Sequence, residues 1–220
     1  MLKKPVAAAL FDMDGLLLDT EVIYIEAMQA AAKGLGREMS LDFCHSMVGV
    51  PGPECNLMIE AYYGAGFNIT EFREHMSIHR QRLMETGIPV KPGVVELLDF
   101  LASRGLPLAV ATSAGRDTAE HHLGKAGLRD RFAALATRDD VERAKPHPGV
   151  YLEAARRLGV APERCLAFED SNIGLEAAHA AGTMAFMVPD LLRPLPESHA
   201  RCLQVLPDLH VALSLLRDHL

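Results

Sequence analysis

The sequence has few cysteines, no excess of positive charge and no long apolar run. Its four cysteines are Cys44, Cys55, Cys165 and Cys202. They are widely spaced and none forms a C-x-x-C pair, so a zinc site or a disulfide framework has little support, and we expect small buried hydrophobic residues. The formal net charge of −7 leaves no basic face for RNA or DNA. We therefore expect no binding of a nucleic acid polymer.

The apolar runs are too short to indicate a membrane segment. The N-terminal stretch MLKKPVAAALF has two lysines and ends at Asp12, which is too early for a signal peptide, and no cleavage site follows. No later run reaches the length of a membrane-spanning helix. With 220 residues, 49% hydrophobic and 23% charged, the composition is typical of a globular protein with one large domain, or one domain and a small insert. We expect a cytoplasmic protein, with a monomer as the default.

Helical and apolar stretches alternate over the C-terminal part of the chain. The expected helices are residues 93–105, 117–127, 148–159 and 174–182. The expected strands are residues 106–112, 132–137, 165–170 and 183–189, and a further strand lies near residues 6–11. This alternation predicts crossover units and a parallel sheet covered by helices on both faces.

An all-helical stretch separates the first strand from the others. Asp19 or Thr20 can cap a helix over residues 20–36, and three further helical segments follow at residues 41–49, 53–64 and 70–87. The sequence thus predicts an α/β fold, a Rossmann-like parallel sheet core with an inserted all-helical domain. Residues 1–18 and 91–220 would form the core, residues 19–90 the insert, with hinges near residues 18–20 and 86–90.

Polar residues stand where the expected strands end. Ligand sites of open parallel sheets form outside the carboxyl ends of the strands. The candidates are Asp12, Asp14, Thr112, Ser113, Lys145, Glu169 and Asp170. So many carboxylates at one edge would repel each other and raise their pKa values unless a cation lay among them. Mg²⁺ is the natural candidate, because it takes oxygen ligands and shares its shell with phosphate.

Taken singly, these residues have simpler explanations. DMDG could be a turn, although a calcium loop fails because Leu16 stands where an oxygen ligand is needed. Thr112 alone would usually cap a helix, and Lys145 alone would be a solvated surface lysine. Glu169 and Asp170 could simply open the next helix.

Other polar residues receive no role. His121 and His122 follow each other in an expected helix and are predicted to face the solvent. In the insert, an exposed helical face explains the remaining candidates at least as well as contact with a substrate does. These candidates are His45, Arg73, His75, His79 and Arg80.

Together, four motifs in this order resemble the haloacid-dehalogenase-like hydrolase superfamily over nearly the whole chain. The first motif, D-x-D-G, is DMDG; the second is Thr112 of LAVATS; the third is Lys145 of AKPHP; the fourth is the acidic pair of FEDSNIG. The insert lies where that family has a helical cap. FDMDGLLLDTE, ATSAG and MVPD are most similar to the branch that contains sugar-phosphate phosphatases and pseudouridine-5′-phosphatase.

The resemblance implies a division of labour among the first-motif residues. Asp12 would attack phosphorus and form an aspartyl phosphate, since a carboxylate is already anionic at neutral pH and needs no base. Asp14 would protonate the leaving group and later activate water. Gly15 would let the chain turn away from the strand.

The remaining motifs would neutralise charge in the transition state. By resemblance, Mg²⁺ is held by the Asp12 carboxylate, the Asp14 backbone carbonyl and Asp170, with Glu169 near it through water. The Lys145 ammonium, the Thr112 hydroxyl and the Ser113 backbone N–H would bind the phosphoryl oxygens. The expected substrate is a small phosphorylated metabolite, a sugar phosphate or a nucleoside monophosphate, chosen by the cap.

Related chemistries are separated by what the chain lacks. Dehalogenases lack the second aspartate and the metal, and phosphonoacetaldehyde hydrolase needs a cap lysine that residues 34–90 do not contain. β-Phosphoglucomutase needs an arginine in its cap loop and a histidine in its first cap helix, where the chain has Gly52 and Tyr24. A mutase therefore stays the minority alternative. A receiver-like signalling module is a further alternative, although such modules are shorter and have no helical insert.

Overall fold

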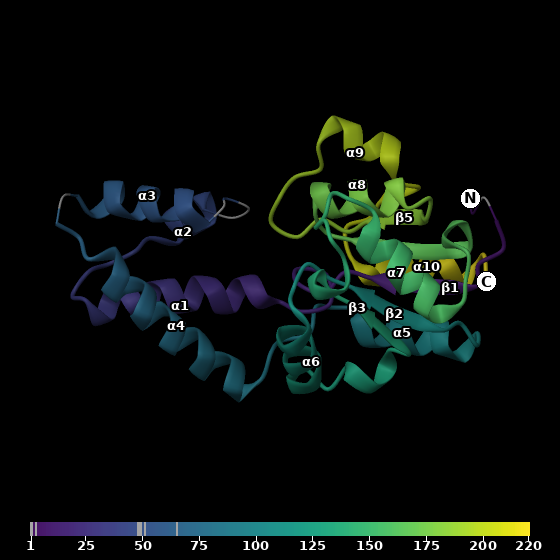
Figure 1. Cartoon of the computed structure of the whole chain (residues 1–220), viewed down its shortest axis with the longest axis horizontal. Coiled ribbons are helices and arrows are strands. Elements are labelled where there is room, and N and C mark those ends of the chain that lie inside the picture. Colours follow the sequence, from purple (N-terminus) through teal and green to yellow (C-terminus); the bar gives the residue numbers. More distant parts are fainter. Residues whose placement is uncertain (1, 3, 48–49, 51, 65) are drawn as a thin grey trace. The chain divides into compact units, whose positions relative to one another are not determined.

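The computed structural model describes residues 2, 4–47, 50, 52–64 and 66–220 (Figure 1). The chain divides into two compact units, Met1–Asp19 with Pro89–Leu220, and Thr20–Ile88. The two points of division lie in the expected hinge regions. Among the described residues, no helix has both the length and the apolar character needed to cross a membrane. All four cysteines are free, and all but the half-buried Cys202 are buried.

The first unit contains a six-stranded parallel sheet. Its strands are β1 (Ala8–Phe11), β2 (Leu108–Ala111), β3 (Ala134–Ala136), β4 (Cys165–Glu169), β5 (Met184–Met187) and β6 (Gln204–Val205). Every described strand pair is parallel, in the order β3-β2-β1-β4-β5-β6. The predicted α/β fold with a parallel sheet is confirmed.

Helices connect these strands and cover the sheet. They are α5 (Val94–Ser103), α6 (Arg116–Lys125), α7 (Gly149–Leu158), α8 (Asn172–Ala180), α9 (Pro196–Arg201) and α10 (Leu209–Arg217), with short 3₁₀ helices at Arg129–Arg131, Arg138–Asp140 and Pro162–Arg164. Side chains alternate between the two faces of each strand. Leu10 and its neighbours of the same parity pack with buried residues of α7 and α8. On the other face of the sheet, the Phe168 ring stacks on the rings of Phe11 and Phe186, with ring centroids 5.0 and 5.6 Å away.

The sequence prediction ended too early at the C-terminus. It assigned no element beyond residue 189, yet α9, β6 and α10 follow. β6 has only two residues, so no alternation of apolar residues could reveal it, and it forms because Leu206 N–H donates to the Met187 carbonyl at 2.7 Å. Asp208 caps α10 by accepting a hydrogen bond from Val211 N–H at 2.9 Å. α10 then packs against α5.

Among its described residues, the second unit contains helices and the segments that connect them, and no strand. It contains α1 (Thr20–Gly34), α2 (Leu41–Ser46), α3 (Gly52–Tyr63) and α4 (Ile69–Thr86), close to the expected segments. Apolar side chains from all four helices, including Met28, Ile59 and Phe72, form its own core. Ser40 and Asn68 cap α2 and α4 with side-chain oxygens. The unit therefore has the packing of a small helical domain.

The strand order places a switch point at the middle of the sheet. From β1 the chain builds the sheet outward on one side through β2 and β3 and on the other through β4, β5 and β6. In open parallel sheets, ligands bind outside the carboxyl ends of the strands at such a point. Phe11 pairs with Phe168 in register, so the residues that follow β1 lie beside those that end β4.

Gly93 tests how α10 is docked. Its φ is +82°, and a Cβ atom there would lie 2.7 Å from the His210 backbone nitrogen. Gly93→Ala should lower the free energy of unfolding by about 2 to 5 kcal/mol, since backbone strain and overpacking add. Gly105 has a φ of +70° and open space around it, so Gly105→Ala should cost only the strain of about 1 to 2 kcal/mol. Urea unfolding measures both, and equal losses would refute tight packing of α10 against Gly93.

Candidate active site

A tight turn follows β1 and brings the first motif to the sheet edge. Asp12 N–H donates to the Phe168 carbonyl at 3.0 Å, and Gly15 N–H donates to the Leu18 carbonyl at 2.8 Å. Gly15 has a φ of +84°, and a Cβ atom there would lie 2.3 Å from Asp170 Oδ2. Glycine is therefore required both by the backbone conformation and by the close approach of Asp170.

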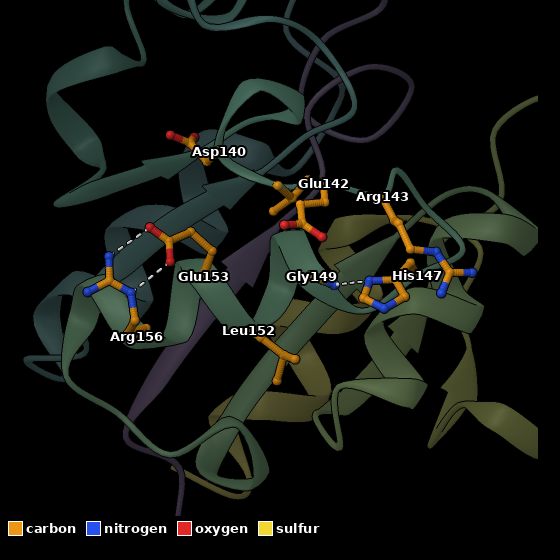
Figure 2. A pocket seen from close by; sticks show the side chains of 9 residues that line it. Asp140, Glu142, Arg143, His147, Gly149, Leu152, Glu153 and Arg156 are labelled. Atoms are coloured by element: carbon orange, nitrogen blue, oxygen red, sulfur yellow. Dashed lines mark hydrogen bonds and ion pairs between the residues drawn. The ribbon is translucent and has the colours of Figure 1, made fainter.

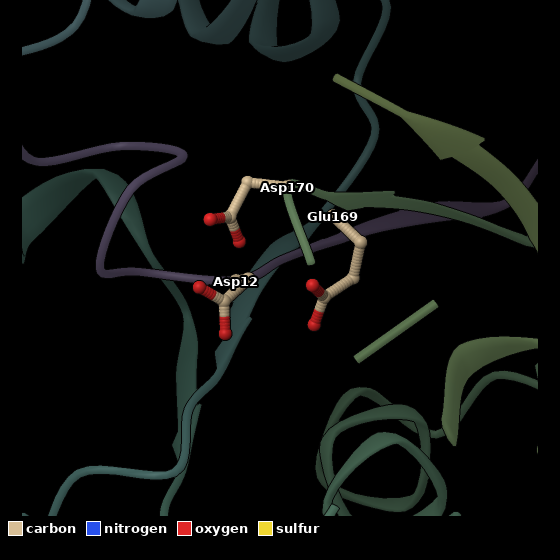
Figure 3. Close-up of side chains that lie close together, drawn as sticks. All are labelled: Asp12, Glu169 and Asp170. Carbon is tan, nitrogen blue, oxygen red and sulfur yellow. The ribbon is translucent and has the colours of Figure 1, made fainter. Parts of the chain in front are cut away.

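Three carboxylates converge at the switch point. Ligand oxygens of Asp12, Glu169 and Asp170 lie within 4.8 Å of one another, and Figure 3 shows the three side chains gathered between the ends of β1 and β4. Asp12 is 7% exposed and Glu169 is fully buried. Such a cluster in a poorly solvated place requires positive charge to be stable.

Lys145 supplies part of that charge. Its Nζ contacts Asp12 Oδ1 and donates to Glu169 Oε1 at 2.6 Å, and its side chain is 4% exposed. Burial lowers the pKa of Lys145, but the two carboxylates outweigh it and raise that pKa above its ordinary value. Lys145 stays a cation there, and the alternative of a solvated surface lysine is wrong.

Both oxygens of Glu169 are occupied by protein donors. Besides Lys145, the Tyr151 hydroxyl donates to Oε1 at 2.7 Å, and the Ser171 hydroxyl and N–H donate to Oε2 at 3.1 and 3.3 Å. At Gly174 a Cβ atom would lie 2.0 Å from the carboxylate. Ser171, and not Glu169, caps α8. Glu169 therefore holds Lys145 in place, and its alternative role as a helix opener is wrong.

Sequence reasoning missed the groups that support Glu169. Tyr151 lies on the buried side of α7 and gave no signal, because a tyrosine at that spacing is typical of a helix packed on a sheet. Ser171 could have been found, since a serine followed by an apolar helical stretch is a typical N-cap. The acidic pair of FED indicated a site, but the hydrogen-bond partners of Glu169 could not all be predicted.

The cluster needs a further cation. Burial raises the pKa of Asp12 to about 7, although the positive charge of Lys145 acts in the opposite direction. The pKa of Asp170 is raised well above its ordinary value, mainly by burial and then by the neighbouring charge of Asp12. Without another positive charge, Asp12 would be only partly ionised at neutral pH. Carboxylate oxygens at this spacing fit a hard divalent ion such as Mg²⁺.

The second-motif residues stand at the end of the adjacent strand. Thr112 is buried directly after β2; its N–H donates to the Ala136 carbonyl and its hydroxyl accepts from Ala114 N–H, both at 3.0 Å. The hydroxyl proton stays available for a ligand. Ser113 is exposed, on the same sheet edge as Asp12.

Charged contacts anchor the segment before Lys145. Asp140 accepts from Thr137, from Arg116 at 2.6 Å and from Arg157 at 2.7 Å, which joins α6 and α7 to the end of β3. A cavity of about 370 Å³ adjoins this segment (Figure 2). Its lining includes His147, Glu153 and Arg156 but none of the candidate residues at the sheet edge, which are Asp12, Asp14, Thr112, Ser113, Lys145, Glu169 and Asp170. The candidate site is therefore the sheet edge and not this cavity.

The carboxylate of Asp14 lies beside a histidine that was expected to be exposed. His122 is only 9% exposed, and its Nδ1 lies 3.9 Å from Asp14 Oδ1. The prediction of a solvent-facing position is wrong for His122 and right for His121. The α6 helix turns His122 inward together with Ala119 and Leu123, three residues before and one after it. A short polar helix gave too weak a periodicity to reveal this side.

A second ion pair lies near the turn and was also missed. Lys91 Nζ is 2.5 Å from Asp190 Oδ1 and 4.0 Å from Asp19 Oδ1. Asp190 belongs to the MVPD stretch and approaches Gly15, where a Cβ atom would be 3.4 Å from its Oδ2. This pair ties the start of α5 to the loop after β5.

In the helical unit, Arg73 is held by its own neighbours. Its guanidinium donates to Asn56 Oδ1 at 2.6 Å, and to the Tyr24 hydroxyl and the Gly52 carbonyl, each at 3.2 Å. Of the stretch VGVPG, residues 48, 49 and 51 lie outside the described residues. The absence of an arginine at position 52 therefore does not leave this region without a cation.

Comparison with known proteins agrees with the motifs. The model of the haloacid dehalogenase-like hydrolase family matches residues 9–188. A phosphorylated-carbohydrate phosphatase from Thermotoga maritima is 34% identical over 175 residues, which is 80% of this chain and 81% of that protein. A Drosophila melanogaster protein provisionally assigned as a pseudouridine-5′-phosphatase is 33% identical over 196 residues, 85% of this chain and 83% of that protein.

A solved structure supports the same relationship. A Thermotoga maritima protein provisionally assigned as a β-phosphoglucomutase has a TM-score of 0.86 and 30% sequence identity. The match covers 98% of this chain and 100% of that chain. The fold of the chain is thus shared with this protein over its full length.

The raised pKa of Asp12 makes cation binding dependent on pH. The carboxyl group of Asp12 loses its proton near its ordinary pKa of 3.8 in the unfolded chain but only near pH 7 in the folded protein. Without metal, the free energy of unfolding should therefore fall as the pH rises from 3.8 to about 7. Mg²⁺ should restore it above pH 7, because it binds the ionised carboxylates. At 100 times the dissociation constant it should raise the melting temperature by roughly 5 to 10 °C at pH 8, and much less at pH 5.

Differential scanning fluorimetry with Mg²⁺ and with EDTA measures this difference. Asp170→Asn should reduce the shift at pH 8, whereas the exposed Asp117→Asn on α6 should keep it. An equal shift at both pH values, or an undiminished one in Asp170→Asn, would show that the ion binds elsewhere.

Proposed function

Because the chain belongs to the haloacid dehalogenase-like hydrolase family, we propose that it is a Mg²⁺-dependent phosphomonoester hydrolase that acts through an aspartyl phosphate on Asp12. One observation carries the proposal: a buried lysine, Lys145, contacts Asp12 beside a second carboxylate, that of Asp170. This arrangement brings a nucleophile and positive charge to one point at the sheet edge. Attack by one anion on another requires that charge.

The residues fit the metal as well as the nucleophile. Asp12, Asp170 and the Asp14 backbone carbonyl are the groups that would hold Mg²⁺, with Glu169 behind them. When bound, the ion supplies positive charge that offsets the charge on the phosphoryl oxygens. The Lys145 ammonium, which contacts Asp12, supplies positive charge in the same way. The Thr112 hydroxyl and the Ser113 N–H donate to the remaining phosphoryl oxygens.

The reaction then runs in two displacements. In the first, an Asp12 oxygen attacks phosphorus, the bond from phosphorus to the ester oxygen breaks, and Asp14 gives its proton to the departing alkoxide. In the second, Asp14 takes a proton from water while the water oxygen attacks phosphorus and the bond to Asp12 breaks. The products are an alcohol and inorganic phosphate, and both aspartates return to their starting state.

The substrate class follows from the relatives and from the helical unit. A small sugar phosphate or nucleoside monophosphate is the substrate, in line with the carbohydrate-phosphate and pseudouridine-5′-phosphate activities after which the relatives are named. The helical unit acts as the cap that selects the alcohol part and excludes water during the reaction. The protein acts in the cytoplasm as a monomer.

A phosphosugar mutase is the second candidate. The similarity to a provisional β-phosphoglucomutase favours it, and so does Arg73, whose guanidinium adjoins Gly52 and Tyr24. Hydrolysis stays preferred because Arg73 already donates to Asn56, Tyr24 and Gly52 within the helical unit, which leaves it poorly placed to hold a second phosphate. The phosphatase names of the sequence relatives point the same way.

Phosphate release from a panel of sugar phosphates and nucleoside monophosphates tests the proposal. The wild type should release phosphate with Mg²⁺ and lose this activity in EDTA. Asp12→Asn should reduce the rate by at least about 10³-fold, because an amide is no nucleophile, whereas the exposed Asp130→Asn should not change it. ³¹P NMR separates the two candidates: inorganic phosphate indicates hydrolysis, and an isomeric sugar phosphate indicates mutation. Full activity of Asp12→Asn would exclude the mechanism.

A further inference from the structure

Among the described residues, two buried side-chain atoms near the first motif have no hydrogen-bond partner: Oδ2 of Asp190, whose other oxygen pairs with Lys91, and Nδ1 of His122. Nδ1 of His122, on α6, is shielded from solvent and unpaired. Asp14 Oδ1 lies 3.9 Å from it, slightly beyond hydrogen-bonding distance. The Asp14 side chain is 41% exposed and has room to rotate, so a movement of about 1 Å would close the gap.

A buried histidine with an unpaired nitrogen at this position lowers the stability of the folded protein, so we expect it to have a function. A buried donor or acceptor without a partner costs about 1 to 3 kcal/mol. The neighbouring inward residues of α6, Ala119 and Leu123, are apolar, and a leucine at position 122 would continue that side. If packing alone decided, an apolar residue would be more stable there. The cost therefore indicates a role in the chemistry of its neighbour.

We propose that His122 is a positioning residue for Asp14. In this role, Nδ1–H of the imidazole donates to the Asp14 carboxyl group. The contact holds that group in the orientation from which it serves first the ester oxygen and then water. The inference rests on the proposed function, because it assigns the partner of the proposed acid and base.

The role predicts a dependence on the leaving group. An alkoxide must receive a proton as it departs, so transfer from a sugar phosphate requires a well-oriented Asp14. 4-Nitrophenolate leaves without a proton, so the first displacement on 4-nitrophenyl phosphate does not require a well-oriented Asp14. A defect in Asp14 orientation should therefore slow the first turnover of the alkyl ester and spare that of the aryl ester.

The substitution His122→Leu tests this with rapid-quench and stopped-flow kinetics in Mg²⁺. The alkyl phosphate of the panel that the wild type hydrolyses fastest should lose about 10-fold or more in first-turnover rate, with KM nearly unchanged. The burst of 4-nitrophenolate should stay within about 2-fold of wild type. His122→Asn, whose amide nitrogen can occupy the place of Nδ1, should recover most of the alkyl rate. His122→Gln, which extends to the place of Nε2, should not.

Matched controls separate a positioning role from a structural one. His121→Leu, on the exposed side of α6, should leave both rates unchanged, and urea unfolding should show that His122→Leu is at least as stable as wild type. Equal slowing of both esters, a change in KM alone, or faster turnover in His122→Leu would overturn the inference. A wild type that releases phosphate from no ester would instead refute the proposed function.

Discussion

The buried contact of Lys145 with two carboxylates is the constraint on which the site depends. Charges removed from water must be paired and fully hydrogen-bonded, and breaking such a group by removing one partner typically costs about 3 to 5 kcal/mol. Tyr151 and Ser171 complete the hydrogen bonding of Glu169, and Gly174 leaves room for its carboxylate. This arrangement fixes the Lys145 ammonium against Asp12. The remaining negative charge on Asp12 and Asp170 is what a divalent cation would balance.

The sheet explains why residues so distant in sequence meet there. β1 lies between β2 and β4, so Asp12 emerges at the point where the order of strands reverses. Asp170 follows β4 and Thr112 follows β2, on either side of it. The turn at Gly15 then directs the chain away from strand β1. The topology thus gathers the candidate site residues at one edge of the sheet.

Much of this was predictable from strand endings. The alternation of helices and strands predicted the parallel sheet, and four motifs in order indicated the family that the comparisons support. The features that the sequence did not reveal depend on the orientation of a helix or on individual hydrogen bonds. His122 was expected in solvent because a ten-residue helix with few apolar residues defines no clear buried side. Tyr151 and Lys91 act through hydrogen bonds to residues far along the chain, which spacing cannot reveal. β6 was too short to show alternation.

The most direct test of the account is chemical trapping of the covalent intermediate. Borohydride reduces an aspartyl phosphate to homoserine, which mass spectrometry locates within a peptide. If Asp14 activates water, Asp14→Asn should hydrolyse the intermediate slowly. This variant with 4-nitrophenyl phosphate and Mg²⁺ should then yield homoserine at position 12, and none without substrate. Turnover of the ester with no conversion at position 12, or conversion at another aspartate, would contradict the central role of Asp12.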